Sequence, residues 1–253
     1  MVVLLFIGWL LNTPGGVLGK ADAVGYALCH RIDERSYHLG GRALPLCVRC
    51  TGMYLGAMLG LAYQALLGRR RGQMPSRWVW GVLGVLVLAF GLDGVNSYAH
   101  LIPGLLPFEV YEPQNWLRLL TGTGMGLAIA VALFPSFNQT VWADWEDRPV
   151  LEGWRAWGGL FGLAVLFDLL VLTESPIILF PLAIASAATA LLVLTMVYAM
   201  VWLILLRREN CFTHLSRLLP YLVGGFALAL AQIIVLDAAR YWLTGTWAGF
   251  SFD

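Results

Sequence analysis

The stretch that decides the fold class is IILFPLAIASAATALLVLTMVYAMVWLILL, Ile177–Leu206, which contains no charged side chain. A helix needs about 20 apolar residues to cross a membrane, because lipid offers no hydrogen-bond partner to an open backbone. This run is longer than one span requires, and Pro176 and Pro181 mark where its regular helix is expected to begin. The rest of the chain has the same character. It is 59% hydrophobic and 12% charged, and a soluble domain carries about twice that charge.

Outward from this run, six other segments have the composition of membrane spans: Val2–Leu18, Cys47–Leu67, Trp78–Tyr98, Trp116–Pro135, Trp157–Thr173 and Leu219–Leu243. The first is the weakest, because Thr13-Pro14-Gly15-Gly16 would break its helix. A cleaved signal peptide is the rival interpretation, although no basic region precedes its apolar run. The sequence therefore predicts an all-α polytopic bundle of about seven spans, or six if the N-terminal segment is removed. Residues 1–253 are expected to form a single membrane domain.

Arginine placement predicts the orientation in a cell membrane, the plasma membrane or bacterial inner membrane. If the spans alternate, nine arginines fall on one side: Arg69, Arg70, Arg71, Arg77, Arg148, Arg155, Arg207, Arg208 and Arg217. The other side holds fewer basic residues, so the nine mark the cytoplasmic face. This places the N-terminus in the cytoplasm and the C-terminus outside. The lipid bilayer is the expected partner, and a net charge of +1 gives no reason to expect nucleic acid.

Two cysteine motifs then lie together on the external side, Cys29-His30 and Cys47-Val48-Arg49-Cys50. Cys47 and Cys50 are spaced i, i+3 at the start of a helix, so both sulfurs point to one face. The helix N-terminus and Arg49 favour the thiolate, which is the form that binds metal or attacks a disulfide. Three cysteines and one histidine would fill a tetrahedral zinc shell. We therefore predict a zinc site formed by Cys29, His30, Cys47 and Cys50.

Two alternatives remain open at these cysteines. One is a pair of buried free thiols, and the other is a disulfide, Cys47–Cys50 or Cys29–Cys50. His38 and His100 are the other candidates for the fourth ligand, and His30 is preferred because it adjoins Cys29.

Polar residues of two further spans point to the same outer end. Asp93, Asn96, Ser97 and His100 share one helical face, and Asn115, Arg118 and Gly122 share another. A charge inside a span is costly and usually pairs within the bundle, so we expect Asp93 to pair with Arg118. If the metal is catalytic, Asp93 or His100 would serve as general base, and Arg118 completes the candidate catalytic set.

The remaining polar residues give weaker signals. Asp168, Glu174 and Asp237 lie in or near the outer halves of their spans and could enlarge the same cavity. Cys211 and His214 fall on the predicted inner side without partners, so we interpret them as incidental.

Glycines recur at every fourth position of one span, at Gly52, Gly56 and Gly60. This spacing lets a neighbouring backbone approach closely. Tight packing inside one bundle is the ordinary interpretation, and a homodimer through these glycines is the alternative.

The motifs together resemble a known family. They are Cys-His-x4-Arg-Ser from Cys29, Pro-x-Cys-x-Arg-Cys-Thr-Gly-x-Tyr-x-Gly from Pro45, and Asp93-Gly94 followed by Asn115-x2-Arg118-x2-Thr-Gly122. They are similar to a predicted prokaryotic membrane protein family catalogued as domain of unknown function 2085. The resemblance covers residues 27–126 and leaves 127–253 as additional helices. It implies a shared site at Cys29, His30, Cys47, Arg49, Cys50, Asp93, Asn115 and Arg118, and it supplies no reaction. Val48, Met53 and Arg31 depart from the family's usual residues.

Three classes of function fit these residues. The residues do not decide whether the chain is an enzyme. The first is a metal site, zinc above all, at the outer face of the bundle. The second is a membrane thiol–disulfide redox protein that uses Cys47 and Cys50 with a quinone or a partner protein. Cys29 would then stay single, which counts against a complete relay. The third is an accessory subunit of a larger membrane complex, or a transporter, with no cofactor at all.

Overall fold

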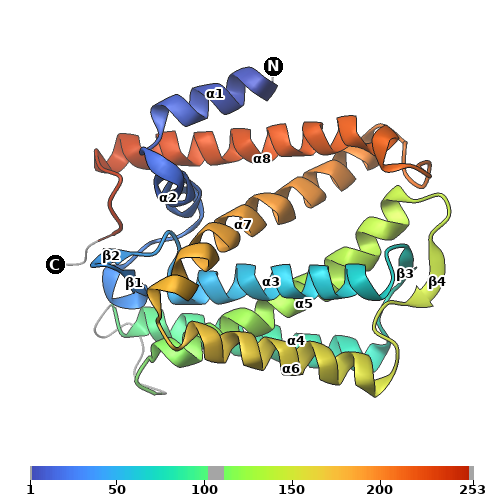
Figure 1. Cartoon of the computed structure of the whole chain (residues 1–253), viewed down its shortest axis with the longest axis horizontal. Coiled ribbons are helices and arrows are strands. Elements are labelled where there is room, and N and C mark those ends of the chain that lie inside the picture. The colour runs from blue at the N-terminus through green and yellow to red at the C-terminus, as the bar shows by residue number, and fades with distance from the viewer. Residues whose placement is uncertain (1, 102–110, 251–253) are drawn as a thin grey trace.

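The computed structural model describes residues 2–101 and 111–250, and nearly all of its regular structure is helical (Figure 1). The helices are α1 (Val2–Asn12), α2 (Gly16–Leu28), α3 (Val48–Leu67), α4 (Arg77–Ala99), α5 (Asn115–Val141), α6 (Gly153–Val171), α7 (Pro176–Leu205) and α8 (Leu215–Thr244). Helices α3 to α8 are each long and apolar enough to cross a membrane. The predicted all-α polytopic fold is confirmed, with helix bounds within a few residues of those predicted. Among α3 to α8 the largest difference is at the end of α5, which continues through Pro135 to Val141.

The N-terminal segment differs from the straight span Val2–Leu18 predicted from the sequence. It forms two helices, α1 and α2, bent by 104° at the break between Asn12 and Gly16, and the chain has a seventh candidate span only if this pair counts as one. Pro14 and the glycines after it interrupt the helix, as their composition predicted. The Lys20 ammonium stabilises the bend by donating to the carbonyl oxygen of Thr13 at 3.0 Å and to that of Leu10. These carbonyls belong to the last turn of α1 and its flank, where intrahelical donors are missing.

Glycines bring the backbones of helices α3 and α5 into close contact. A Cβ added at Gly52 or Gly56 of α3 would collide with the backbone of α5, and one added at Gly126 of α5 would collide with the backbone of α3. Gly60 faces the side chain of Ala130 in the same interface. Tight packing within one bundle is therefore confirmed. The face that carries Gly52, Gly56 and Gly60 is covered by α5 and is not available to a second copy of the chain, so the dimer interpretation of these glycines is wrong.

Two small sheets mark opposite ends of the bundle (Figure 1). Strands β1 (His38–Leu39) and β2 (Arg42–Ala43) form an antiparallel hairpin, and β3 (Arg71–Gln73) pairs in parallel with β4 (Glu146–Pro149). The hairpin follows a short 3-10 helix, η1 (Asp33–Arg35). The end of α2, the start of α3 and the end of α8 all meet near the hairpin, and we refer to this as the cysteine end of the bundle. The opposite end is the β3–β4 end.

Candidate metal centre

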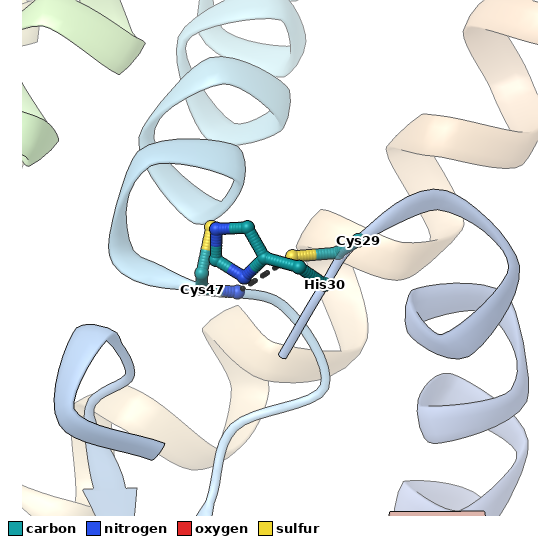
Figure 2. A group of neighbouring side chains, drawn as sticks. All are labelled: Cys29, His30 and Cys47. Atoms are coloured by element: carbon teal, nitrogen blue, oxygen red, sulfur yellow. Dashed lines mark hydrogen bonds between the residues drawn. The ribbon is translucent and has the colours of Figure 1, made fainter. Parts of the chain in front are cut away.

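Two helix termini bring Cys29, His30 and Cys47 together. Cys29 is the C-terminal cap of α2, and Cys47 is the N-terminal cap of α3. One ligand atom from each of the three residues lies within 4.8 Å of the other two. Figure 2 shows the His30 ring extending from the α2 side toward Cys47, with Cys29 beside it. The Cys47 backbone N–H donates to the Cys29 sulfur at 3.3 Å, so the two segments are linked even without a metal.

A glycine makes this close approach possible. The loop before α3 crosses α2 at Gly25, where an added Cβ would collide with the carbonyl group of Pro45. Gly25 also accepts, through its carbonyl oxygen, the backbone N–H of Cys29 at 2.8 Å. The absence of a side chain at one residue of α2 therefore lets both cysteine segments reach the same point.

The environment of the cluster favours one thiolate beside neutral donors. Hydrogen bonds from the thiols of Cys47 and Cys50 hold the pKa of Cys29 well below its usual range, against the effect of burial. The same bond to Cys29 raises the pKa of Cys47 to about 12. Burial lowers the pKa of His30, which favours the neutral imidazole that binds metal. The hydrogen bonds from Cys47 and Cys50 therefore stabilise the thiolate form of Cys29.

Cys50 lies one turn into α3, next to this group of three. Its side chain packs against the buried cluster of Cys29, Leu46 and Cys47 and interacts with both of the other thiols. All of the described cysteines are free of disulfides. The structure therefore brings three of the four predicted ligands together and leaves the fourth beside them.

Arg240 of α8 holds the backbone that carries Cys29 and His30. Its Nη1 donates to the carbonyl oxygens of Tyr26 and Cys29, both at 2.6 Å, and its Nη2 donates to that of His30 at 3.2 Å. The guanidinium lies between the rings of Tyr26 and Phe250, at 4.1 and 4.2 Å from their centroids. A cation here satisfies the free carbonyls at the C-terminus of α2. Sequence reasoning missed this residue, although an arginine inside a predicted span was a usable signal.

The buried ion pair at this end is Asp93–Arg49, so the predicted pair of Asp93 with Arg118 is wrong. Nε of Arg49 donates to the Asp93 carboxylate at 2.8 Å, and its Nη2 also binds the same carboxylate. The Tyr111 hydroxyl donates to the other carboxylate oxygen at 2.7 Å. The physical reason is that the Arg49 guanidinium lies directly against Asp93, to whose carboxylate and backbone carbonyl it donates. The Arg118 guanidinium donates instead to the Asn115 side chain on its own helix, at 2.7 Å.

The other histidine candidates lie apart from the three-residue group. Nδ1 of His100 is 3.0 Å from the carbonyl oxygen of Asn96, and His38 forms an exposed pair with Asp33 at 3.0 Å. Cys211 and His214 are exposed in the segment between α7 and α8, where Arg70 at the β3–β4 end donates to the Thr213 carbonyl oxygen.

The weaker acidic candidates do not line the cavity at the cysteines either. The buried Asp168 accepts a hydrogen bond from Thr123 at 2.7 Å. Asp237 faces a different cavity, between α1 and α8, which Trp9 also lines. The cavity at the cysteines has a volume of about 560 Å³. Cys29, His30, Cys47, Arg49 and Cys50 form one wall, and α4 from Phe90 to Tyr98 forms the other.

These residues are also the ones through which the chain is related to other proteins. Residues 29–132 match the model of the family described as Predicted membrane protein (DUF2085). The resemblance noted in the sequence is confirmed, with a match that runs six residues beyond 126. The match includes every predicted ligand together with Asp93 and Arg118, whereas Arg240 and Asp237 lie outside it.

Two uncharacterized proteins are similar to part of the chain. An uncharacterized protein of Methanocaldococcus jannaschii is 24% identical over 125 residues, which are 49% of this chain and 72% of that protein. An uncharacterized protein of Methanothermobacter thermautotrophicus is 29% identical over 104 residues, 41% of this chain and 82% of that protein. No solved structure matches the chain.

Proposed function

We propose that this membrane protein binds one zinc ion at the external end of its bundle through Cys29, His30, Cys47 and Cys50. The observation that carries the proposal is the meeting of three soft ligand atoms from two separate segments within 4.8 Å. Donors around a tetrahedral zinc lie roughly 3.3–3.8 Å from one another, so only a small contraction is needed. Thiolate and imidazole donors suit zinc, whereas magnesium and calcium require oxygen ligands.

The role that the site supports best is structural. A tetrahedral site with four protein ligands is closed and leaves no position for a substrate water. The candidate base Asp93 is already bound by Arg49 and by the Tyr111 hydroxyl. A closed zinc site would fasten the end of α2 to the start of α3, and α8 would be attached to the same point through Arg240.

Metal analysis with matched cysteine variants tests the proposal. Protein purified under reducing conditions without chelator is expected to hold about one zinc per chain. Cys29→Ser and Cys47→Ser should each remove most of it, because each variant deletes a ligand. Cys211→Ser is the control, since this exposed thiol lies at the other end, and it should keep the zinc.

The same cysteines support a second candidate, thiol–disulfide exchange, because three thiols are in mutual contact and one of them favours the thiolate. Forming a disulfide between two of them would release two electrons and two protons to a quinone or to a partner disulfide. Metal-free protein with a stable disulfide among Cys29, Cys47 and Cys50 would contradict the zinc proposal and support this one.

The external position of the site is part of the proposal, and the excess of arginines at the β3–β4 end supports it. The native Cys211 reports on this orientation without any engineering. In intact cells, a membrane-impermeant thiol reagent should leave Cys211 unlabelled, and it should label Cys211 after lysis. Labelling of Cys211 in intact cells would invert the orientation.

A further inference from the structure

Three buried arginines converge beside the cysteine cluster from three different elements. Arg35 ends η1, Arg49 lies in the first turn of α3, and Arg118 lies in the first turn of α5. Their exposed fractions are 6%, 8% and 7%. The charge of Arg118 is within interaction range of both other guanidinium groups, and all three act on His30. Like charges this close in a buried site repel one another, so their presence requires compensation.

The described residues supply only part of that compensation. The one buried carboxylate that binds any of the three is Asp93, and Arg49 takes it through both Nε and Nη2. Three acidic groups act on Arg35, those of Tyr98, Cys47 and Glu34, and the carboxylate among them, Glu34, has an exposed side chain. Three arginines and one aspartate leave a net charge of +2. A zinc ion with three thiolates would carry −1, and the buried group would still hold +1.

Two hydrogen-bond donors of this group also lack acceptors. Nη1 of Arg35 and Nε of Arg118 are buried without a partner among the described residues. The remaining contacts of these two side chains go to neutral oxygens, the Ser97 carbonyl and the Asn115 amide. A buried donor without an acceptor is costly, and a charged one more so. Excess positive charge and unused N–H groups in one place both indicate a missing anion.

From this geometry we infer that Arg35, Arg49 and Arg118 form a binding site for a phosphate-type oxyanion. A guanidinium group can donate two parallel N–H bonds to two oxygens of one phosphate, which an ammonium group cannot do. A tetrahedral anion can accept from several directions at once, as three converging side chains require. The site uses none of the proposed zinc ligands, so it stands whether or not the cysteines hold a metal.

Of the three arginines, Arg49 lines the cavity at the cysteines, and this cavity favours a phospholipid headgroup as the source of the anion. Its α4 wall includes the exposed residues Gly91, Val95 and Tyr98, and α4 is the span with the smallest buried share. An acyl chain on that surface would place its phosphate at the level of Arg49. Free phosphate from the aqueous side shares the same chemistry, and the experiment separates the two sources.

The test measures anion binding to the full-length protein in detergent, with three probes. Native mass spectrometry reports retention of phosphatidylglycerol against diacylglycerol with the same acyl chains, and 31P NMR titration reports binding of inorganic phosphate. We expect retention of phosphatidylglycerol over diacylglycerol. Arg35→Gln and Arg118→Gln should each weaken retention about tenfold or more, because each removes a charged donor. Arg69→Gln is the matched control, since Arg69 is exposed at the β3–β4 end, and it should bind as the native protein does.

Each outcome has a defined meaning. Binding of phosphatidylglycerol alone identifies a headgroup site, and binding of inorganic phosphate as well shows that the free ion enters too. Equal retention of both lipids with no phosphate binding, or native binding in both glutamine variants, would overturn the inference. If a glutamine variant does not fold, Arg35→Lys keeps the charge but loses the fork, and it should bind more weakly than the native protein. Zinc content measured on the same samples separates this site from the proposed metal, because Arg35→Gln should keep its zinc.

Discussion

The two ends of the bundle hold their arginines in different ways. At the β3–β4 end, Arg70 pairs with Asp144 and Arg71 with Glu146 and Glu152, all through partly exposed side chains. At the cysteine end, Arg35, Arg49 and Arg118 are buried, and only Arg49 among them pairs with a carboxylate in the described structure, that of the buried Asp93. Exposed ion pairs contribute little, because water screens both charges whether or not they meet. A buried charge, in contrast, lowers the stability of the fold strongly when its partner is removed.

This difference indicates where function resides. In the proposed orientation the β3–β4 end faces the cytoplasm, where any basic residue near the membrane surface would serve to orient the chain. At the cysteine end, three buried arginines lie beside a cluster of thiols, and burying each of these charges lowers the stability of the fold. Such an arrangement persists in a membrane protein when a ligand or a reaction uses it. The comparison therefore supports the two proposals made above, an orienting role for the arginines of the β3–β4 end and a binding role for those of the cysteine end.

The largest expected effect comes from breaking the Asp93–Arg49 pair. Asp93→Asn should lower the free energy of unfolding by about 3–5 kcal/mol, because Arg49 is left as an uncompensated buried charge. Arg49→Gln should act similarly, and the double variant should cost less than the two losses added. Asp144→Asn, at the exposed pair with Arg70, should cost less than about 1 kcal/mol. Unfolding titrations in mixed micelles measure all four variants.

The same series checks the comparison itself. Strictly additive losses for Asp93 and Arg49 would show that the two side chains do not depend on each other. A loss at Asp144 as large as that at Asp93 would remove the distinction between the two ends. Arg118→Gln combined with Asp93→Asn should show weaker coupling than Arg49→Gln combined with Asp93→Asn.

The sequence predicted the helical bundle well, because length and hydropathy are properties of single segments. Helices α3 to α8 follow from apolar runs alone, and Pro14 correctly marked the break after α1. The near neighbours Cys29, His30 and Cys47 were also predictable, since two short motifs flank one loop. Partners on different spans were not, because spacing within a helix says nothing about which helix lies opposite. Asp93 was therefore assigned to Arg118 when Arg49 binds it.

Arg240 was missed for the same reason. It lies in the last span, outside the matched region, and no local motif links it to residues more than 200 positions earlier. Its contacts are to backbone oxygens, and a sequence does not show which backbone groups are left without donors at a helix end. Contacts of this kind become visible only when the two helix ends are seen together.

Arg240 and Arg49 both lie at the cysteine end, but their partners differ. Arg240 donates to backbone carbonyl oxygens, whereas Arg49 pairs with a carboxylate. Arg240→Gln should lower zinc affinity about 10–100-fold, the usual effect of losing a group that orients a metal ligand. Arg240→Lys should give a smaller loss, because an ammonium keeps the charge but cannot reach three carbonyl oxygens in one plane. Competition with a chromophoric zinc chelator measures the affinity. Arg155→Gln is the control, since that exposed arginine contacts only the Trp154 ring among the described interactions. Unchanged zinc affinity with lower thermal stability would make Arg240 a structural tie between α2 and α8 and nothing more.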